Sequence, residues 1–315
     1  MRIAFLDDFH NAYAETEGVA RLRTHAEVEI FTDHVDDVAT LNSFDALVAT
    51  RERTRFTPEL LQALDRVRII AQTGNHAYHI DLEEAERRNI VIGKATGGFC
   101  TSAGEMTFAL MMAVMRNIPN TDRAIKNGEW PTPMTYVLRG KTLGIVGLGN
   151  IGRYVAGIAK AFGMNVIAWG HRLTPETAAA SGAEYRALDD LMREADIVTV
   201  HATMAPETRG LIDQRRIAMM KPTAYIVNTS RGPIIEEAAL VAALQNGHIA
   251  GAGLDVFDQE PLPGTHPLTK LNNVVLTPHL GWPTDEMYGQ FATAAADILI
   301  DFKDGKDVPK FKPRQ

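Results

Sequence analysis

The stretch that decides the fold is Lys141–Arg172, KTLGIVGLGNIGRYVAGIAKAFGMNVIAWGHR. An apolar run, Leu143–Val146, is followed by the glycine pattern G-x-G-x-x-G at Gly147–Gly152. A segment with apolar residues at helical spacing comes next, and a second apolar run, Val166–Trp169, completes the unit. Strand, glycine turn, helix and strand within about 30 residues match a βαβ dinucleotide-binding unit. The sequence therefore predicts a parallel α/β fold that binds a dinucleotide.

The three glycines of this turn have separate physical roles. Gly147 allows the tight turn, Gly149 lets a pyrophosphate approach the backbone, and Gly152 lets helix and strand pack closely. Backbone N–H groups at the start of the helix then face the phosphates. A glycine pattern alone also occurs in ordinary loops, but the flanking strands and helix favour cofactor binding.

The end of the second apolar run departs from the usual NAD-binding pattern. An acidic residue about 20 positions after the glycines normally accepts a hydrogen bond from the ribose 2′-OH of NAD. No Asp or Glu occurs from Arg153 through Pro175, and Trp169 is followed by Gly170–Arg172. A cation at this place suits the 2′-phosphate of NADP. We therefore expect Arg172 to favour NADP. If Arg172 is only a surface residue, NAD is the alternative.

The composition limits the possible partners. The chain has 315 residues, of which 45% are hydrophobic, enough for two domains with cores of their own. A net charge of −7 argues against a nucleic acid or an anionic membrane as partner. Cys100 is the one cysteine, so no disulfide framework forms, and no apolar run approaches the length of a membrane span. The N-terminal residues read as a strand and not as a signal peptide, so we expect a cytoplasmic protein.

Short apolar runs alternate with helix-like segments along both halves of the chain, which indicates parallel α/β sheets. The strands expected in the first half are Ile3–Leu6, Val28–Phe31, Ala46–Ala49, Arg68–Ala71 and Ile90–Ile92. The strands expected in the second half are 143–147, 165–169, 196–200, 223–228, 250–255 and 273–276.

Two longer helices are expected outside this alternation. Thr101–Asn127 is the longest helical pattern, and Pro119 should kink or divide it. Its methionines are predicted to pack in a core or a subunit interface and not to bind a metal. A last helix is expected at Asp285–Lys303, returning to the first domain, with a loose tail from Pro309 onward.

Three candidate catalytic residues follow predicted strands of the second half, where parallel sheets bind their ligands. Arg231 can grip a carboxylate in a bidentate fork. His279 is the natural proton donor near neutral pH, and the Glu260 carboxylate can hold its imidazole. Each residue alone is ordinary, but at three strand ends opposite a nicotinamide site they predict a catalytic set.

Four motifs continue this pattern, and the resemblance that rests on them covers essentially the whole chain. They are VGLGNIG at 146–152, HATMAPETRGLI at 201–212, VNTSRGPIIEEAALVAALQNGHIAGAGLDVFDQEP at 227–261 and TPHLG at 277–281. With them the chain resembles the D-isomer-specific 2-hydroxyacid dehydrogenases, which include glyoxylate/hydroxypyruvate reductases and phosphoglycerate dehydrogenases. The resemblance implies an α/β fold of two Rossmann-like domains with doubly wound parallel sheets and the active site in the interdomain cleft.

The resemblance also implies a domain division. A discontinuous substrate (catalytic) domain is expected at residues 1–98 plus 287–315, and a dinucleotide-binding Rossmann domain at residues 99–286. The long helix near 101–117 is expected to link the domains and to help form a homodimer.

The roles that the resemblance implies are those of an NAD(P)-dependent oxidoreductase. Hydride passes between the nicotinamide and carbon 2 of a small 2-oxo or D-2-hydroxy acid. Arg231 matches the substrate-binding arginine, Glu260 the glutamate that orients the histidine, and His279 the acid/base. Besides the three glycines and Arg172, the implied cofactor contacts are Asn150, Ile151, Thr229, Ser230 and Asp255.

The substrate contacts are implied by the same resemblance. They are Thr73, Gly74, Asn75, Arg231, His279 and Trp282. The loop at Asn75–Tyr78 departs from the family's small, hydrophobic pattern, Arg51–Thr54 adds cations nearby, and Trp282 stands where a small residue is common. These departures leave the substrate open, with glyoxylate or hydroxypyruvate as the examples that the family offers.

Three other functions share this fold. Formate dehydrogenases would require Gln in place of Glu260, whereas phosphite dehydrogenases keep the Arg-Glu-His set. Cofactor-sensing corepressors are the non-enzymatic alternative, and turnover of a 2-oxo acid would separate that class from an enzyme.

Overall fold

The computed structural model describes residues 1–97 and 101–313, and it divides into two compact units. Unit 1 contains Met1–Gly98 and Pro283–Gln315, and unit 2 is Phe99–Trp282. The second boundary lies four residues before the expected 286/287 because helix α12 (Asp285–Lys303) starts at its N-cap, Thr284, and belongs to unit 1 as a whole. Cys100 lies outside the described residues.

Unit 1 is a five-stranded parallel sheet in the order β2-β1-β3-β4-β5. Its central strands β3 and β4 are buried along their whole length, as expected for a parallel sheet covered on both faces. The strands are β1 (Arg2–Phe5), β2 (Glu27–Ile30), β3 (Ala46–Ala49), β4 (Ile69–Thr73) and β5 (Val91–Ala95). The helices, besides α12, are α1 (Glu17–Arg23), α2 (Val38–Leu41), α3 (Pro58–Ala63) and α4 (Leu82–Arg87).

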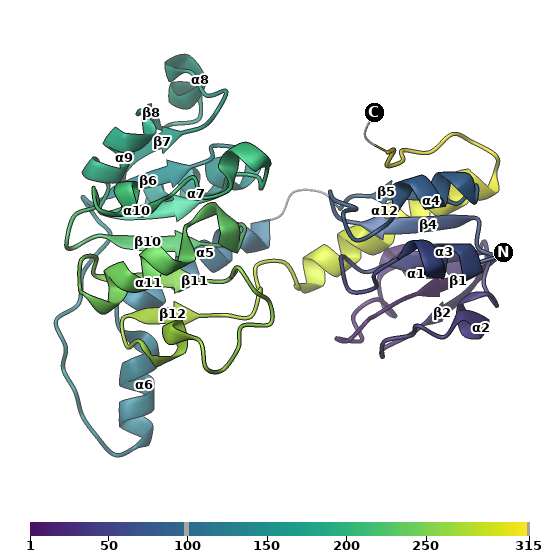
Figure 1. Ribbon diagram of the computed structural model, residues 1–315, viewed down its shortest axis with the longest axis horizontal. Coiled ribbons are helices and arrows are strands. Elements are labelled where there is room, and N and C mark those ends of the chain that lie inside the picture. Colours follow the sequence, from purple (N-terminus) through teal and green to yellow (C-terminus); the bar gives the residue numbers. More distant parts are fainter. Residues whose placement is uncertain (98–100, 314–315) are drawn as a thin grey trace. The chain divides into compact units, whose positions relative to one another are not determined.

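Unit 2 is a seven-stranded parallel sheet in the order β12-β11-β10-β9-β6-β7-β8. Its strands are β6 (Thr142–Val146), β7 (Asn165–Trp169), β8 (Glu184–Tyr185), β9 (Ile197–Val200), β10 (Tyr225–Asn228), β11 (Gly251–Leu254) and β12 (Val274–Leu276). Five of them lie within the expected runs, and β6 begins one residue before its expected run, at Thr142. The edge strand β8 was not expected, because its two residues are too short to form an apolar run. In both units Figure 1 shows the helices packed over the sheets, so the predicted α/β class is confirmed.

The long helical pattern of unit 2 is divided, as Pro119 predicted. Helix α5 (Thr101–Met115) ends before Asn117, whose φ of 53° breaks the helix, and α6 (Ile118–Lys126) starts with Pro119 in its first turn. Proline is tolerated there because the first N–H groups of a helix have no partner within it. The other helices are α7 (Asn150–Ala161), α8 (Pro175–Ala180), α9 (Leu188–Glu194), α10 (Gln214–Ile217) and α11 (Glu237–Gln245), with short 3₁₀ turns at η1 (Pro206–Thr208), η2 (Gly232–Ile234) and η3 (Pro267–Lys270).

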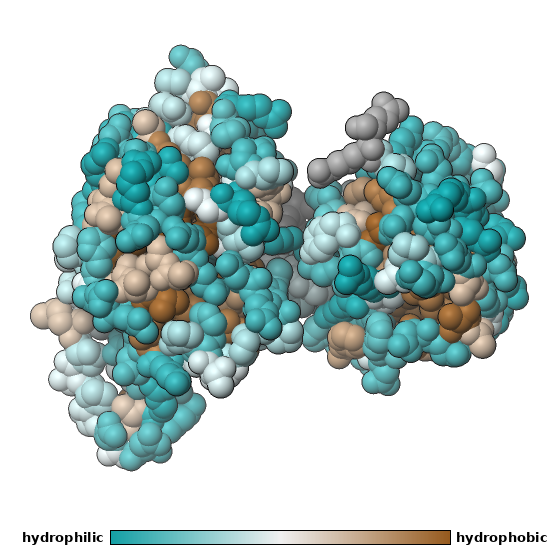
Figure 2. Space-filling model, in the orientation of Figure 1, coloured by the Kyte–Doolittle hydropathy of each residue, from teal (hydrophilic) through white to brown (hydrophobic). Residues whose placement is uncertain are grey.

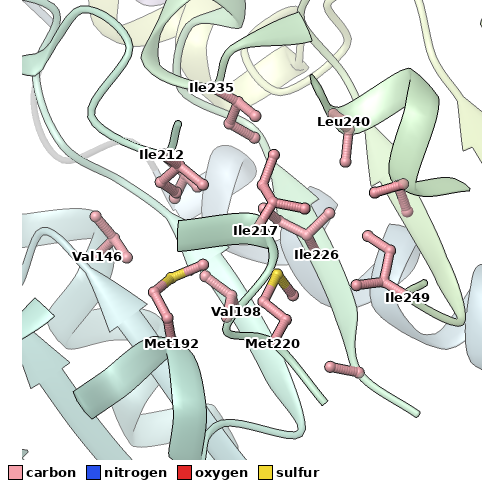
Figure 3. Packing of buried hydrophobic residues seen from close by; sticks show 14 of the residues in the cluster. Val146, Met192, Val198, Ile212, Ile217, Met220, Ile226, Ile235, Leu240 and Ile249 are labelled. Carbon is pink, nitrogen blue, oxygen red and sulfur yellow. The ribbon is translucent and has the colours of Figure 1, made fainter. Parts of the chain in front are cut away.

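Apolar side chains from both faces of the unit 2 sheet form its core. Figure 3 shows one face, where Val146, Val198 and Ile226 from the sheet meet side chains of the covering helices. On the other face Met111 and Met115 of α5 are buried, and Met106 and Met112 pack partly buried against the same cluster. The predicted core packing of these methionines is therefore confirmed.

The C-terminal segment of the chain packs on unit 1. The prediction of a loose tail from Pro309 onward is wrong in part. Helix α12 lies so close to α1 that a Cβ at Gly18 would be 2.3 Å from the carbonyl carbon of Ala292. The predicted return of this helix to the first domain is thus confirmed. After it, Lys94 N–H donates to Pro309 O at 2.8 Å and Phe311 N–H donates to Ile92 O at 2.8 Å. The segment is ordered because β5 is an edge strand whose backbone groups need partners.

No helix among residues 1–97 and 101–313 is long and apolar enough to cross a membrane. The face drawn in Figure 2 is mostly hydrophilic, with hydrophobic residues showing between polar ones.

Candidate active site

Three loops of unit 2 begin at the same edge of its sheet. Strands β10, β11 and β12 are neighbours in register, with Asn228 opposite Leu254 and Leu254 opposite Leu276. The loops that carry Arg231, Glu260 and His279 follow these strands directly. Parallel pairing therefore brings together three segments that are far apart in the sequence.

The His279 imidazole is hydrogen-bonded to Glu260. His279 Nδ1 lies 2.7 Å from Glu260 Oε2, and Phe257 N–H donates to Glu260 Oε1 at 3.0 Å. Burial raises the pKa of Glu260, but the hydrogen bond from His279, the Phe257 N–H and the charges of His279 and Arg231 outweigh it, so that the pKa is lowered. An ionised carboxylate only accepts hydrogen bonds, so Nδ1 of His279 donates. The other ring nitrogen, Nε2, is then the one available for proton transfer.

The Arg231 loop packs directly against the loop that carries Glu260. Gly232 lies so close to it that an added Cβ would be 2.1 Å from the carbonyl carbon of Phe257. Asn228 fixes the turn before it, because its side chain donates to Arg231 O at 2.9 Å and accepts from Ser230 N–H at 3.0 Å. The guanidinium of Arg231 donates to Ser230 O at 2.6 Å. The half-buried arginine is thus held next to the His279–Glu260 pair.

Asp255 is buried directly beneath the His279 loop. Its two carboxylate oxygens accept from Leu280 N–H at 2.7 Å and Gly281 N–H at 2.8 Å, and the hydroxyl of Thr277 donates to the same group. Burial raises the pKa of Asp255, although these hydrogen bonds oppose the shift. The carboxylate therefore holds the loop through its backbone N–H groups.

The glycine turn of unit 2 has the geometry that a dinucleotide needs. Gly147 has a φ of 105°, and a Cβ there would lie 2.5 Å from Ala202 N. A Cβ at Gly152 would lie 2.3 Å from Gly147 O, whereas at Gly149 it would meet no described atom within 4 Å. Gly149 is the N-cap of α7, and Gly149 and Asn150 are both exposed, so no N-cap side chain covers the start of this helix. Such an N-terminus binds phosphate, and the residues present therefore fit a dinucleotide.

The Gly170–Arg172 turn lies beside the glycine turn. Gly147 N–H donates to Trp169 O at 2.8 Å, which joins the end of β7 to the turn. His171 packs edge-on against Trp169 with ring centroids 5.7 Å apart, and the Arg172 side chain is exposed. A cation therefore stands where most NAD-binding units carry a carboxylate.

The remaining expected residues lie in several places. Thr229 is buried, and its hydroxyl lies 2.9 Å from that of Thr107 on α5. Trp282 is half-buried at the end of unit 2. Thr73 and Gly74 belong to unit 1, at the end of β4, where Gly74 has a φ of 94° and lies against the Arg51 side chain. Asn75, which follows them, is exposed, whereas Thr73 and Gly74 are buried.

Two hydroxyls next to these loops were not predicted as functional from the sequence. Ser102 on α5 donates to Gly281 O at 2.8 Å, and Thr277 donates to Asp255. The first contact joins residues 179 positions apart, so local spacing does not reveal it. Serine and threonine are also common in ordinary helices and loops.

Comparisons with known proteins identify the family of this chain. The family model described as "D-isomer specific 2-hydroxyacid dehydrogenase, NAD binding domain" matches residues 108–281. A glyoxylate reductase of Aeropyrum pernix is 43% identical over 270 residues, which are 83% of this chain and 81% of that protein. A D-3-phosphoglycerate dehydrogenase of Synechocystis sp. is 39% identical over 289 residues, 90% of this chain but 52% of that protein. This chain therefore spans about half the length of that dehydrogenase.

Solved structures show the same fold. A phosphoglycerate oxidoreductase from Vibrio cholerae is 32% identical, with a TM-score of 0.85 over 97% of this chain and 99% of that chain. The family match, the relatives and the geometry of unit 2 lead to one conclusion. The chain belongs to the D-isomer-specific 2-hydroxyacid dehydrogenase family and is an oxidoreductase that transfers hydride between a nicotinamide dinucleotide and a small 2-oxo or 2-hydroxy acid.

Proposed function

We propose that this enzyme reduces a small 2-oxo acid of the glyoxylate or hydroxypyruvate type. The main support is the hydrogen bond of 2.7 Å between His279 Nδ1 and Glu260 Oε2, beside the loop that holds Arg231. The substrate type follows from the glyoxylate reductase of Aeropyrum pernix, to which the chain is 43% identical.

The chemistry assigns one role to each of the three side chains. The bound nicotinamide supplies the hydride. Arg231 holds the substrate carboxylate and the carbonyl oxygen through its fork of N–H donors. His279 carries the proton on Nε2 and delivers it to that oxygen, while Glu260 accepts from Nδ1 and stabilises the imidazolium.

The cofactor contacts follow from the glycine turn and the neighbouring strand ends. The proposed set is Gly147, Gly149, Asn150, Ile151, Gly152, Arg172, Thr229, Ser230 and Asp255. The open space over Gly149 and the exposed N-terminus of α7 support the phosphate site. The exposed cation Arg172 supports a preference for NADP over NAD, because a 2′-phosphate needs a positive partner.

The substrate contacts are proposed on the resemblance. In unit 1 they are Thr73, Gly74 and Asn75, which would hold the substrate carboxylate through backbone N–H groups; in unit 2 they are Arg231, His279 and Trp282. Unit 1 is accordingly proposed as the substrate domain, and unit 2 as the dinucleotide-binding domain.

We also propose that the enzyme is a homodimer. No side chain of α6 is buried, and Ile118 and Ile125 on this helix are 50% and 53% exposed. Trp130 and Met134, in the segment after it, are 82% and 85% exposed. Figure 1 shows α6 extending beyond the unit 2 sheet. A second copy of the chain would cover this apolar surface, and light scattering after size exclusion tests it, since a single chain mass would contradict it. A cytoplasmic location stays a prediction from the sequence.

A substrate panel with both reduced cofactors tests the proposed function. We expect turnover of glyoxylate and hydroxypyruvate, faster with NADPH than with NADH. No turnover of any 2-oxo acid, together with oxidation of phosphite, would contradict the substrate class. No turnover of either kind, with the cofactor bound, would support a cofactor-sensing protein instead.

A further inference from the structure

We propose that the hydroxyls of Ser102 and Thr277 are positioning groups that hold the His279 loop in its reactive geometry. Together with Asp255 they form a clamp around residues 277–281. The proposal rests on the proposed role of His279 as proton donor. Neither hydroxyl belongs to the proposed cofactor or substrate contacts, so each acts through His279.

The backbone of His279 needs such a clamp. Its φ of 57° lies in the left-handed region, which residues with a Cβ rarely adopt. Residues held there persist only where the surroundings over-determine them. Here the His279 N–H donates to Asp255 O at 2.9 Å and to Thr277 O at 3.0 Å. The histidine therefore keeps this conformation because its own loop and the end of β11 fix its backbone.

The lower side of the clamp is the Asp255 carboxylate. It accepts from the two N–H groups that follow His279, those of Leu280 and Gly281, at 2.7 and 2.8 Å. The Thr277 hydroxyl donates to the oxygen that Leu280 also uses. One buried group thus binds the loop on both sides of the histidine. Thr277 supplies a neutral donor to a carboxylate whose burial disfavours its charge.

The other side of the clamp is helix α5. The Ser102 side chain is buried, and its hydroxyl donates to Gly281 O at 2.8 Å. The space between the Asp255 carboxylate and helix α5 is narrow. A Cβ at Gly281 would lie 3.0 Å from Asp255 Oδ2 and 3.6 Å from Ala103 Cα. The loop is therefore enclosed between the end of β11 and the first turn of α5.

The same helix also contacts the Arg231 segment. Thr107, further along α5, places its hydroxyl 2.9 Å from that of Thr229. Helix α5 thus touches both the segment that carries the proton donor and the segment that carries the proposed carboxylate-binding arginine. Because Glu260 is itself fixed by Phe257 N–H, its 2.7 Å contact with His279 depends on where the clamp holds the histidine.

The test compares two Thr→Val changes in unit 2. Thr277→Val removes the donor to Asp255 at constant volume. Thr199→Val, in the middle of β9, removes a buried hydroxyl that has no partner among the described residues. We expect Thr277→Val to lower kcat about tenfold with a larger solvent deuterium isotope effect, because proton delivery becomes slower. The dissociation constant of the reduced cofactor should stay within about twofold, and Thr277→Ser should restore kcat.

Two further variants keep the proposal open to refutation. Ser102→Ala should lower kcat by a smaller factor, about threefold to tenfold, and Ser102→Thr should restore it. These two decide the question if Thr277→Val does not fold. The clamp is contradicted if the variants turn over within about twofold of Thr199→Val, or if cofactor affinity falls as much as kcat. His279→Ala is measured beside them: an active His279→Ala refutes the proposed role of His279, whereas an inactive one beside normal clamp variants refutes only the clamp.

Discussion

The glycine turn and the His279 loop are both at carboxyl ends of strands in unit 2, yet they are built in opposite ways. At the turn, three positions lack a side chain: Gly147 and Gly152 sit where a Cβ would collide with backbone, and Gly149 faces open space. At the His279 loop, a side chain is held in an unfavourable backbone conformation by a buried carboxylate. The comparison teaches that the cofactor end depends on local backbone shape, whereas the catalytic end depends on contacts between distant segments.

Substitutions at the catalytic end should have the largest effect on the reaction. Arg231→Ala should lower kcat/KM about 10³-fold, because a two-pronged, charge-assisted contact with the substrate carboxylate is lost. Cofactor affinity, measured by fluorescence titration, should hardly change. Arg231→Lys is the matched control, which keeps the charge but not the fork and should recover only part of the activity. Unchanged kcat and KM in Arg231→Ala would refute the role of this arginine.

Substitutions at the glycine turn should act on stability and cofactor affinity. Gly147→Ala should lower the free energy of unfolding by about 3 kcal/mol, since its φ of 105° and its contact with Ala202 exclude a Cβ. Gly149→Ala should cost less than about 1 kcal/mol, because its Cβ meets open space, but it should weaken dinucleotide binding. Urea unfolding and cofactor titration separate the two effects. Equal stability losses would show that the two glycines do not differ as described.

The difference between these two regions also explains which features of the fold could be predicted from the sequence. The glycine turn, the strands of both sheets other than β8 and the division at Pro119 follow from local patterns, so they could be predicted. The two-residue strand β8 and the pairing of Phe311 with Ile92 depend on sheet edges that exist only in the folded chain. The contact of Ser102 with Gly281 likewise has no local pattern.

At the cofactor-binding end, the preference between NADPH and NADH is expected to depend on one side chain, that of Arg172. Arg172→Ala should reduce the preference for NADPH over NADH by about tenfold in kcat/KM, because one positive partner of a 2′-phosphate is lost. His171→Ala, at the neighbouring exposed position, is the control and should move the ratio less. If the ratio stays constant in Arg172→Ala, this residue is an ordinary surface cation.

The smallest expected effect concerns the pH dependence of stability at Glu260. Its pKa is lowered from 4.5 in the folded protein, mainly by the hydrogen bond from His279 against the opposing effect of burial. A carboxylate with a lowered pKa contributes stability that is present above the unfolded value and is lost as the pH falls through the folded one. The difference in unfolding free energy between the native protein and Glu260→Gln should therefore shrink as the pH falls below 4.5. Because the side chain is 37% exposed, the difference should stay below about 1 kcal/mol. A difference that grows toward acid pH would contradict the sign.

The measurement that tests the proposed chemistry most directly is the turnover of His279→Ala at saturating 2-oxo acid and reduced cofactor. We predict that kcat falls by about 10³-fold or more, as for the loss of a general acid and the contacts around it, while the dissociation constant of the cofactor changes less than about twofold. A near-normal kcat would contradict the assignment of His279 as the proton donor.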